Sequence, residues 1–275
     1  MQIIKGMEIA QEIKRFWRAA NEDENISPVL AIILVGNQED SSVYVNLKEK
    51  AVEYIHGQTR LVYLDEGADK ATLIKNIREL NEDNQIHGII VQLPLPQHLE
   101  PWREEILASI NPDKDVDGFT PGNLGLLFSG NPGFISCAAL GCLEVMERVY
   151  PGYREKEIIL AGDSFDLVLP LAVTLIKNGA RVRVVPEYTP DLAGQAEILV
   201  VEKGGPRVLK GEHLSREILL IDAGFYWESG KSCGNVDQAS IAACAGYLLP
   251  VPGGLGPILI AKLTENLCRA ARRKT

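Results

Sequence analysis

Short apolar runs alternate with longer stretches of helical period along most of the chain. The runs have strand length and are rich in Val, Ile and Leu; they cover residues 29–35, 60–64, 86–93, 157–161, 181–185, 197–201 and 217–221. Between them, apolar residues recur at three- and four-residue spacing and predict helices over 7–20, 41–55, 71–81, 137–149, 167–178 and 256–272. Such alternation is typical of α/β proteins with largely parallel sheets.

A segment rich in Pro and Gly, residues 119–133, separates the earlier predicted strands from the later ones. A domain boundary is expected there, because boundaries fall in segments of this composition. The length of 275 residues is compatible with two domains. The pattern therefore predicts two α/β units with separate sheets.

Composition narrows the class of protein. The chain has 46% hydrophobic and 24% charged residues, which excludes a disordered protein and a collagen-like fold. The net charge of -9 argues against nucleic-acid binding, and no apolar stretch reaches the ~18 to 20 residues of a membrane span. The segment 1–12 lacks the hydrophobic region of a signal peptide. The 5 cysteines form no close C-x-x-C pair, so we expect reduced structural thiols, no metal site and a cytoplasmic location.

A lysine interrupts an apolar stripe on the helix predicted from residue 41. By the i, i+3, i+4 rule, one face carries Tyr44, Leu47, Lys48, Ala51, Val52 and Ile55. Lys48 is open to two interpretations: a side chain that covers apolar surface while its amine reaches water, or a partly desolvated amine that moves protons near neutral pH. Tyr44, one turn away, could flank the same site.

An amide side chain stands at the carboxyl end of a strand that is apolar throughout. Gln92 follows Ile89, Ile90 and Val91, and ligands of open α/β sheets bind beyond such strand ends. Gln92 could therefore hydrogen-bond a substrate or Lys48. The alternative is an amide satisfied by the backbone of the loop.

Two loops carry further candidate chemistry. The run 113–118, D-K-D-V-D-G, matches the opening of a calcium loop, but its twelfth position is Leu124 instead of glutamate and Pro121 falls inside it, so calcium is rejected. A solvated turn and a carboxylate presented to a polar ligand remain as alternatives. The stiff run 250–257, P-V-P-G-G-L-G-P, favours a loop that lines a ligand over a plain connection.

Taken together, these motifs resemble those of the methylenetetrahydrofolate dehydrogenase/cyclohydrolase family. The motifs are Tyr44-x-x-x-Lys48, V-Q-L-P-L-P over 91–96, P-D-K-D-V-D-G-F over 112–119 and P-V-P-G-G-L-G-P over 250–257. The resemblance extends from the I-K-G run at 4–6 to the last helix. It implies an N-terminal three-layer α/β catalytic domain (1–120), completed by the C-terminal helix (255–275), and a Rossmann-type domain (121–254). The folate would bind in the cleft between them.

The resemblance also implies residue roles. Lys48 would transfer the proton in the cyclohydrolase step, in which water adds to methenyltetrahydrofolate and the ring opens to formyltetrahydrofolate. Gln92 would hydrogen-bond Lys48 and the one-carbon centre, and Tyr44 would pack along the substrate. Asp117 would bind the amino-pyrimidine edge of the pterin, because a carboxylate can pair with two adjacent N–H donors. The substrate would also contact Pro252, Gly253 and Gly254.

The turn that holds the dinucleotide in this family departs from the family pattern. Where members have G-R-S-x-x-V-G-x-P, this chain has G-D-S-F-D-L-V-L-P over 162–170. Asp163 replaces an arginine and Val168 replaces a glycine, and both changes oppose a bound phosphate. A second turn, A-V-G-like in the family, reads V-E-K-G over 201–204.

Some residues of the Rossmann-type half could still contact NAD or NADP. Gly162 and Ser164 remain in the turn, and Glu187 follows the second strand of this half, where an acidic residue can hold a ribose hydroxyl. A simpler role for Asp163 and Asp166 is to stabilise the start of the next helix through its dipole. In that case they would substitute for a bound anion.

We therefore expect a folate-dependent enzyme of one-carbon metabolism that acts as a methenyltetrahydrofolate cyclohydrolase more than as a methylenetetrahydrofolate dehydrogenase. One alternative is the full bifunctional enzyme that uses NAD or NADP. Another is a non-catalytic relative that binds folate or serves in regulation. Resemblance to the family further implies a homodimer that pairs through its Rossmann-type domains.

Overall fold

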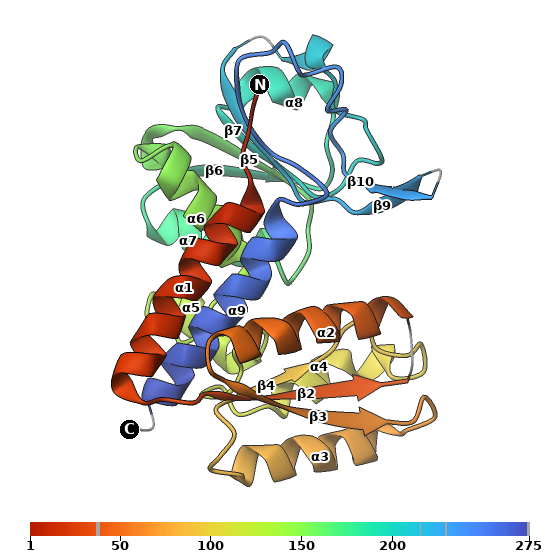
Figure 1. Ribbon diagram of the computed structural model, residues 1–275. Helices are drawn as coiled ribbons and strands as arrows, with labels where there is room; N and C mark the ends of the chain where they lie inside the picture. Colours follow the sequence, from red (N-terminus) through yellow and green to blue (C-terminus); the bar gives the residue numbers. More distant parts are fainter. Residues whose placement is uncertain (37–38, 215, 229, 274–275) are drawn as a thin grey trace. The chain divides into compact units, whose positions relative to one another are not determined.

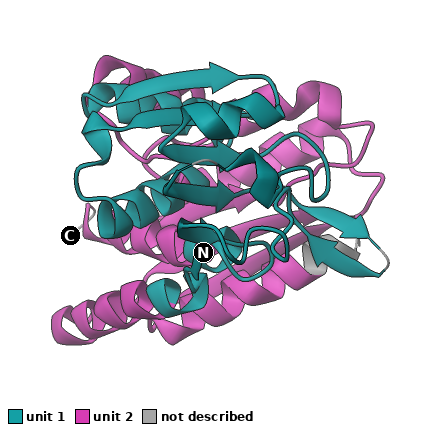
Figure 2. Ribbon diagram, turned by 90° about the horizontal axis from the view of Figure 1, so that it is seen from above, with its two compact units in different colours: residues 1–10, 138–259 teal, residues 11–137, 260–275 magenta. Residues whose placement is uncertain are grey.

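The computed structural model describes residues 1–36, 39–214, 216–228 and 230–273, except for the side chains of residues 39–42. These residues form two compact units (Figure 2). Unit 1 contains residues 1–10 and 138–259, and unit 2 contains residues 11–137 and 260–275. The division near residue 137 lies after the Pro- and Gly-rich segment, and the last helix is shared between the units.

Unit 2 is built on a parallel sheet of order β3-β2-β4. Its strands are β2 (Val29–Val35), β3 (Gln58–Leu64) and β4 (Gly88–Val91). Helices α2 (Glu39–Tyr54) and α3 (Lys70–Glu82) lie on opposite sides of the sheet (Figure 1). The central strand β2 is buried along nearly its whole length because both of its faces are covered.

Unit 2 contains further helical segments. They are η1 (Glu100–Trp102), α4 (Arg103–Ala108), α5 (Pro121–Ser129) and the unit 2 parts of α1 (Gly6–Glu24) and α9 (Leu255–Arg272). Helices α1 and α9 run side by side (Figure 1), and Arg272 Nη1 donates to Asn21 Oδ1 at 3.0 Å. Asn21 in turn donates to the Ile55 carbonyl at 2.7 Å, which ties α1 to the end of α2.

Unit 1 is built on a six-stranded parallel sheet of order β1-β11-β8-β7-β5-β6. The strands are β1 (Gln2–Ile3), β5 (Glu157–Ala161), β6 (Arg181–Val185), β7 (Ile198–Val201), β8 (Ile218–Asp222) and β11 (Gly246–Leu249). Helix α8 (Pro190–Gln195) covers one face, where Leu192 and Ala193 join the core with side chains of β5, β7, β8 and β11. Helices α6 (Cys137–Val149) and α7 (Val168–Lys177) lie on the other face (Figure 1).

The predicted α/β class with parallel sheets is confirmed, and each predicted strand and helix overlaps an observed one. Several short elements were not predicted: β1, β11, the antiparallel hairpin β9 (Tyr226–Glu228) with β10 (Lys231–Cys233), η2 (Tyr153–Glu155), η3 (Gly211–His213), η1, α4, α5 and α8. They are too short to show a period of their own. Strands β1 and β11 form because neighbours distant in sequence provide their hydrogen-bonding partners.

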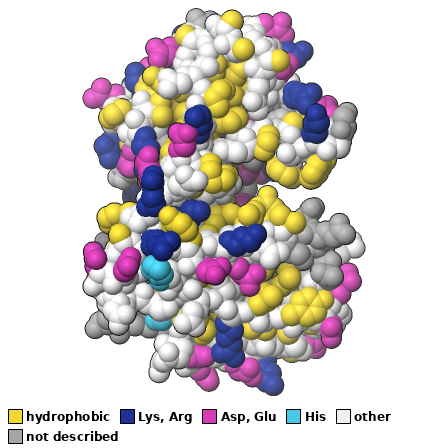
Figure 3. Space-filling model, in the orientation of Figure 1, with side chains coloured by type: hydrophobic (Ala, Val, Ile, Leu, Met, Phe, Trp, Pro, Cys, Tyr) yellow, Lys and Arg dark blue, Asp and Glu magenta, His cyan; other side chains and the backbone are white. Residues whose placement is uncertain are grey.

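Charges of both signs alternate over the visible surface. On the face drawn in Figure 3, Lys and Arg side chains lie among Asp and Glu side chains over both units. Among the described residues, no helix is long and apolar enough to cross a membrane. The same part of the chain contains no cluster of three or more His, Cys, Asp or Glu side chains that could hold a metal ion.

Candidate active site

Lys48 lies on the buried face of α2. Lys48 is only 8% exposed, and the same face buries Val45, Ala51 and Val52, while Ile55 is buried directly after the helix. Tyr44 was predicted to share this face but is 43% exposed, as Leu47 is at 45%. The buried side of the helix is therefore centred nearer Val45 than the predicted apolar face, and Tyr44 and Leu47 lie at the exposed edge of that face.

Gln92 holds the amine of Lys48. Lys48 Nζ donates to Gln92 Oε1 at 3.0 Å, and the bond is buried. Gln92 Nε2 donates to the Leu93 carbonyl at 2.7 Å, which fixes the orientation of the amide with its oxygen toward the lysine. Both interpretations of Gln92, an amide satisfied by the loop and a partner of Lys48, are thus realised by its two ends.

The position of this pair follows from the sheet topology. Strand β3, which follows β2 in the sequence, pairs with one edge of β2, and the later strand β4 pairs with the other edge. Ligands of open α/β sheets bind at the carboxyl ends of the two strands where the order reverses. Lys48 comes from the helix after β2, and Gln92 directly follows β4, with its N–H donating to the Ile33 carbonyl at 2.9 Å.

The loop 113–118 brings a carboxylate to the same sheet edge. Asp115 pairs with Ile89 in a parallel bridge, so the segment extends the sheet beside β4. Asp117, two residues further on, is half-buried at the carboxyl end of this extension. Its charge raises, and the charge of Lys48 lowers, the pKa of the nearby Cys137 thiol, although burial is the largest cause of the raised pKa of that thiol.

Two neighbouring charges in this loop have structural roles. Lys114 is 2% exposed, and its ammonium donates to the carbonyls of Leu80, Asn81 and Asp83 at 2.7–2.8 Å. These hydrogen bonds satisfy carbonyl groups at the end of α3 that have no partner within the helix. Asp115 is 1% exposed and accepts hydrogen bonds from several backbone N–H groups. Its carboxylate therefore shapes the turn that presents Asp117.

Cys137 is a neighbour of the site for which the sequence predicts no functional role. It is buried at the start of α6, its Sγ lies 3.4 Å from the Val116 carbonyl, and Asn266 Nδ2 donates to it at 3.6 Å. The sequence predicts that it is a structural thiol, like the other four free cysteines. Its sequence signal is the run S-C-A-A-L-G over 136–141, which stands where the family pattern has P-C-T-P-x-G.

The loop before α9 belongs to unit 1. Gly254 is buried, and a Cβ on it would lie 2.2 Å from the Pro250 carbonyl oxygen. A Cβ on Gly6 would lie 1.9 Å from the Gly254 oxygen, so the two glycines allow the starts of α1 and α9 to approach. Pro252 and Gly253 are exposed, and Gly253 has φ +89°. Close packing thus accounts for Gly254, whereas substrate contacts of Pro252, Gly253 and Gly254 stay predictions.

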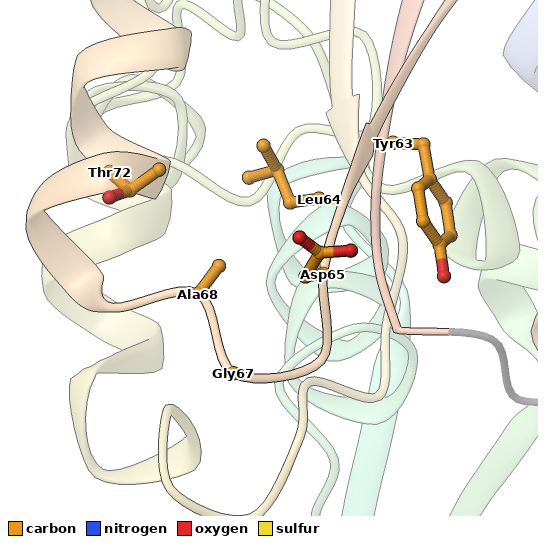
Figure 4. A pocket seen from close by; sticks show the side chains of 6 residues that line it. All are labelled: Tyr63, Leu64, Asp65, Gly67, Ala68 and Thr72. Carbon is orange, nitrogen blue, oxygen red and sulfur yellow. The ribbon is translucent and has the colours of Figure 1, made fainter.

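A surface depression of about 480 Å³ lies elsewhere in unit 2, at the carboxyl end of β3 (Figure 4). It is lined by Tyr63, Leu64, Asp65, Gly67, Ala68 and Thr72. Asp65 and Gly67 are exposed, and Asp65 is the single charged side chain of the lining. Because buried polar groups converge instead on Lys48 and Gln92, we place the candidate active site there.

In unit 1, the polar groups of the turn after β5 form hydrogen bonds and an ion pair within the protein. Ser164 Oγ accepts hydrogen bonds from the N–H groups of Leu167 and Val168, both at 3.2 Å, and so caps α7. Asp163 forms an ion pair with Lys203 instead of capping the helix. Helix α7 begins at Val168 and has no acidic residue in its first turn, so the predicted stabilisation of the helix start by Asp163 and Asp166 is wrong.

Comparisons with known proteins identify the family. The profile described as tetrahydrofolate dehydrogenase/cyclohydrolase, catalytic domain, matches residues 4–117, and the profile of its NAD(P)-binding domain matches residues 136–275. The chain belongs to the tetrahydrofolate dehydrogenase/cyclohydrolase family. It is therefore an enzyme of folate-dependent one-carbon metabolism, with a catalytic domain and a Rossmann-type domain.

Individual relatives span the whole chain. It is 53% identical to "Bifunctional protein FolD 1" of Syntrophomonas wolfei, over 100% of both chains. A crystal structure of the bifunctional methylenetetrahydrofolate dehydrogenase/cyclohydrolase of Campylobacter jejuni matches with TM-score 0.92 and 35% identity over 100% of both chains. The Trypanosoma brucei enzyme, complexed with NADP and an inhibitor, matches with TM-score 0.90 and 28% identity over 98% of this chain and 97% of that one. These relatives favour the bifunctional alternative over an enzyme that is mainly a cyclohydrolase.

The side chains of the 162–168 turn do not fit a dinucleotide phosphate as they stand. A Cβ on Gly162 would lie 2.4 Å from Glu202 Oε2 and 2.9 Å from Val168 Cγ2, so these two side chains crowd the glycine. The N–H of Ser164 donates to Glu202 Oε2 at 3.4 Å. Glu187 is exposed after β6, where a ribose contact stays a prediction.

Proposed function

We propose that the protein is a bifunctional enzyme that oxidises methylenetetrahydrofolate to methenyltetrahydrofolate and hydrolyses the latter to formyltetrahydrofolate. The observation that carries the hydrolytic half is the buried 3.0 Å hydrogen bond between Lys48 Nζ and Gln92 Oε1 at the edge of the catalytic sheet. The dehydrogenase half is supported by the relatives and by the match of residues 136–275 to an NAD(P)-binding domain.

The cyclohydrolase step needs a group that moves a proton twice. Water attacks the methenyl carbon and loses a proton, which leaves a neutral carbinol. The bond from that carbon to the ring nitrogen then breaks as this nitrogen gains a proton, and the carbinol hydroxyl loses its proton to solvent as the formyl C=O forms. In the proposed mechanism, the Lys48 amine takes the first proton and returns it to the leaving nitrogen. Gln92 holds Nζ in place, because its own amide is fixed by the Leu93 carbonyl.

Substrate binding is assigned to residues around this pair. Asp117 would pair with the amino-pyrimidine edge of the pterin, and its half-buried position beside β4 supports a charge-assisted contact. Tyr44 is one turn from Lys48, and its exposed ring could pack along the substrate without being part of the protein core.

The side chains at the 162–168 turn do not fit a phosphate as they stand, so the dehydrogenase activity is supported by the relatives and by the NAD(P)-binding domain match alone. A bound nicotinamide would supply the hydride acceptor. Gly162, Ser164 and Glu187 are the residues that we propose to approach NAD or NADP. A homodimer formed through the Rossmann-type domains and a cytoplasmic location remain proposals that rest on the family resemblance.

The proposal is tested with purified protein in a spectrophotometric assay. Loss of methenyltetrahydrofolate is followed directly, and methylenetetrahydrofolate is supplied with NAD or NADP separately. We expect methenyl loss well above the spontaneous rate, together with reduction of at least one cofactor. Methenyl loss without cofactor reduction would restrict the protein to the cyclohydrolase, and the absence of both activities would favour the non-catalytic alternative.

A substitution tests the role of Lys48. Lys48→Met keeps the length and the apolar stem of the side chain but removes the amine, so we expect cyclohydrolase turnover to fall at least about 100-fold. Lys50→Met, at an exposed position on the same helix, is the matched control and should retain turnover. Unchanged turnover in Lys48→Met would show that another group moves the proton.

A further inference from the structure

The turn after β5 and the turn after β7 meet at the point where the strand order of unit 1 reverses. Strand β5 pairs with β7 on one side and with β6 on the other, and Ala161 and Val201 are register partners. Gly162 and Glu202 directly follow these partners. Phosphate-bearing ligands of such sheets bind at this reversal, against the backbone of the first turn.

A carboxylate of the protein already occupies this place. Glu202 Oε2 accepts a hydrogen bond from the Ser164 N–H at 3.4 Å and lies 2.4 Å from where a Cβ on Gly162 would stand. Burial raises the pKa of the Glu202 carboxyl, whereas hydrogen bonds from Ser164 and the backbone of Asp163 lower it. Backbone N–H groups of a turn are the donors that ordinarily receive a phosphate.

The neighbouring donors and the nearby cation are also engaged. The N–H groups of Leu167 and Val168 donate to Ser164 Oγ, so the first turn of α7 is satisfied internally. Lys203, the residue after Glu202, is paired with Asp163. A dinucleotide that approached this turn would therefore meet a negative charge in place of open donors.

We propose that Glu202 is an internal competitor for the dinucleotide: its carboxylate occupies the phosphate position at the 162–164 turn and sets the affinity for NAD and NADP. The inference rests on the proposed function, because it concerns the cofactor of the dehydrogenase half. It makes Glu202 a determinant of cofactor affinity and not a catalytic residue. Dinucleotide binding requires the Glu202 carboxylate to leave the turn.

The test is direct binding of NAD and of NADP to the full chain by isothermal titration calorimetry. Glu202→Ala removes the carboxylate and its bulk, and Glu202→Gln removes the charge alone. We expect both variants to bind the dinucleotides more tightly than the unaltered protein, Glu202→Ala by about tenfold or more. Glu147→Ala, which removes one exposed carboxylate from α6 in the same unit, should leave the affinity unchanged.

Circular dichroism and a cooperative thermal transition establish that each variant is folded. If Glu202→Ala does not fold, Glu202→Gln provides the test. Equal or weaker binding by folded Glu202 variants would overturn the inference. If the Glu202 variants bind no more tightly but the unaltered protein binds NAD or NADP tightly, the proposed dehydrogenase activity stands. If no variant binds either dinucleotide, both the Glu202 inference and the dehydrogenase half fail, whereas the Lys48→Met test of the cyclohydrolase is independent.

Discussion

At the scale of single residues, the same chemical group has different roles in different surroundings. Asp115 is a buried acceptor of backbone hydrogen bonds, and Asp117 is a half-buried carboxylate at a sheet edge two residues away. Glu202 is held against the start of a turn, where burial penalises its charged form. Residue type alone did not distinguish these three roles, because burial and nearby donors decide what a carboxylate does.

The raised pKa of Glu202 gives a pH-dependent contribution to stability. Because folding raises this pKa above its ordinary value of 4.5, the folded chain binds the proton more tightly than the unfolded chain. The stabilisation is complete below that ordinary value and is lost as pH rises through the folded-state pKa. Above its folded-state pKa, the ionised, half-buried carboxylate therefore opposes folding.

We expect Glu202→Gln to raise Tm at pH 8 by about 1–3 °C, allowing for solvent screening, and to have a smaller effect near pH 4.5. Thermal unfolding across this pH range measures the difference between the variant and the unaltered chain. A difference that does not vary with pH would show that the ionisation of Glu202 does not affect folding. Glu147→Gln, at an exposed position, is the control.

At the scale of elements, one buried carboxylate organises the loop that presents Asp117. Asp115 Oδ1 accepts from the N–H groups of Gly118 and Phe119, and Oδ2 accepts from Thr120. Asn123 Nδ2 also donates to Oδ2 at 2.9 Å, which connects the loop to α5. The loop conformation is therefore fixed by several hydrogen bonds to a single side chain.

Asp115→Ala should lower the free energy of unfolding by about 2–4 kcal/mol, because buried donors would lose their acceptor. It should also raise KM for the folate more than it lowers kcat, since Asp117 would be displaced while Lys48 and Gln92 stay in place. Asp113→Ala, whose side chain is 80% exposed, is the matched control. Denaturant unfolding measures the change in stability, and steady-state kinetics measure KM and kcat. An unchanged KM would show that Asp115 does not contribute to substrate binding.

At the scale of the whole molecule, two helices contribute residues to both compact units. The unit boundaries cut α1 after residue 10 and α9 after residue 259. Within unit 1, Gly6 at the start of α1 packs against the backbone of Gly254 just before α9. This contact joins segments near opposite ends of the chain.

Gly6→Ala should destabilise the protein by about 1–3 kcal/mol, because the added Cβ would meet a backbone oxygen that cannot move aside cheaply. Gly67→Ala is the control, since a Cβ there would meet nothing within 4 Å. Thermal and denaturant unfolding of both variants measure the effect. Equal stability of Gly6→Ala and the unaltered chain would mean that the starts of α1 and α9 can separate without loss.

The sequence by itself determined the α/β class, the main strands and helices, and the family resemblance. It could do so because apolar periodicity and short motifs are local properties of the chain. Lys48 and Gln92 were recognised in the same way, as polar residues at apolar positions.

The tertiary structure decided what depends on neighbours distant in the sequence. It showed that Lys48 donates to Gln92, that the buried side of α2 leaves Tyr44 exposed, and that strands β1 and β11 extend the second sheet. It also placed Glu202 at the turn after β5. Hydrogen-bond partners and burial are set by long-range packing, which no local pattern of residues encodes.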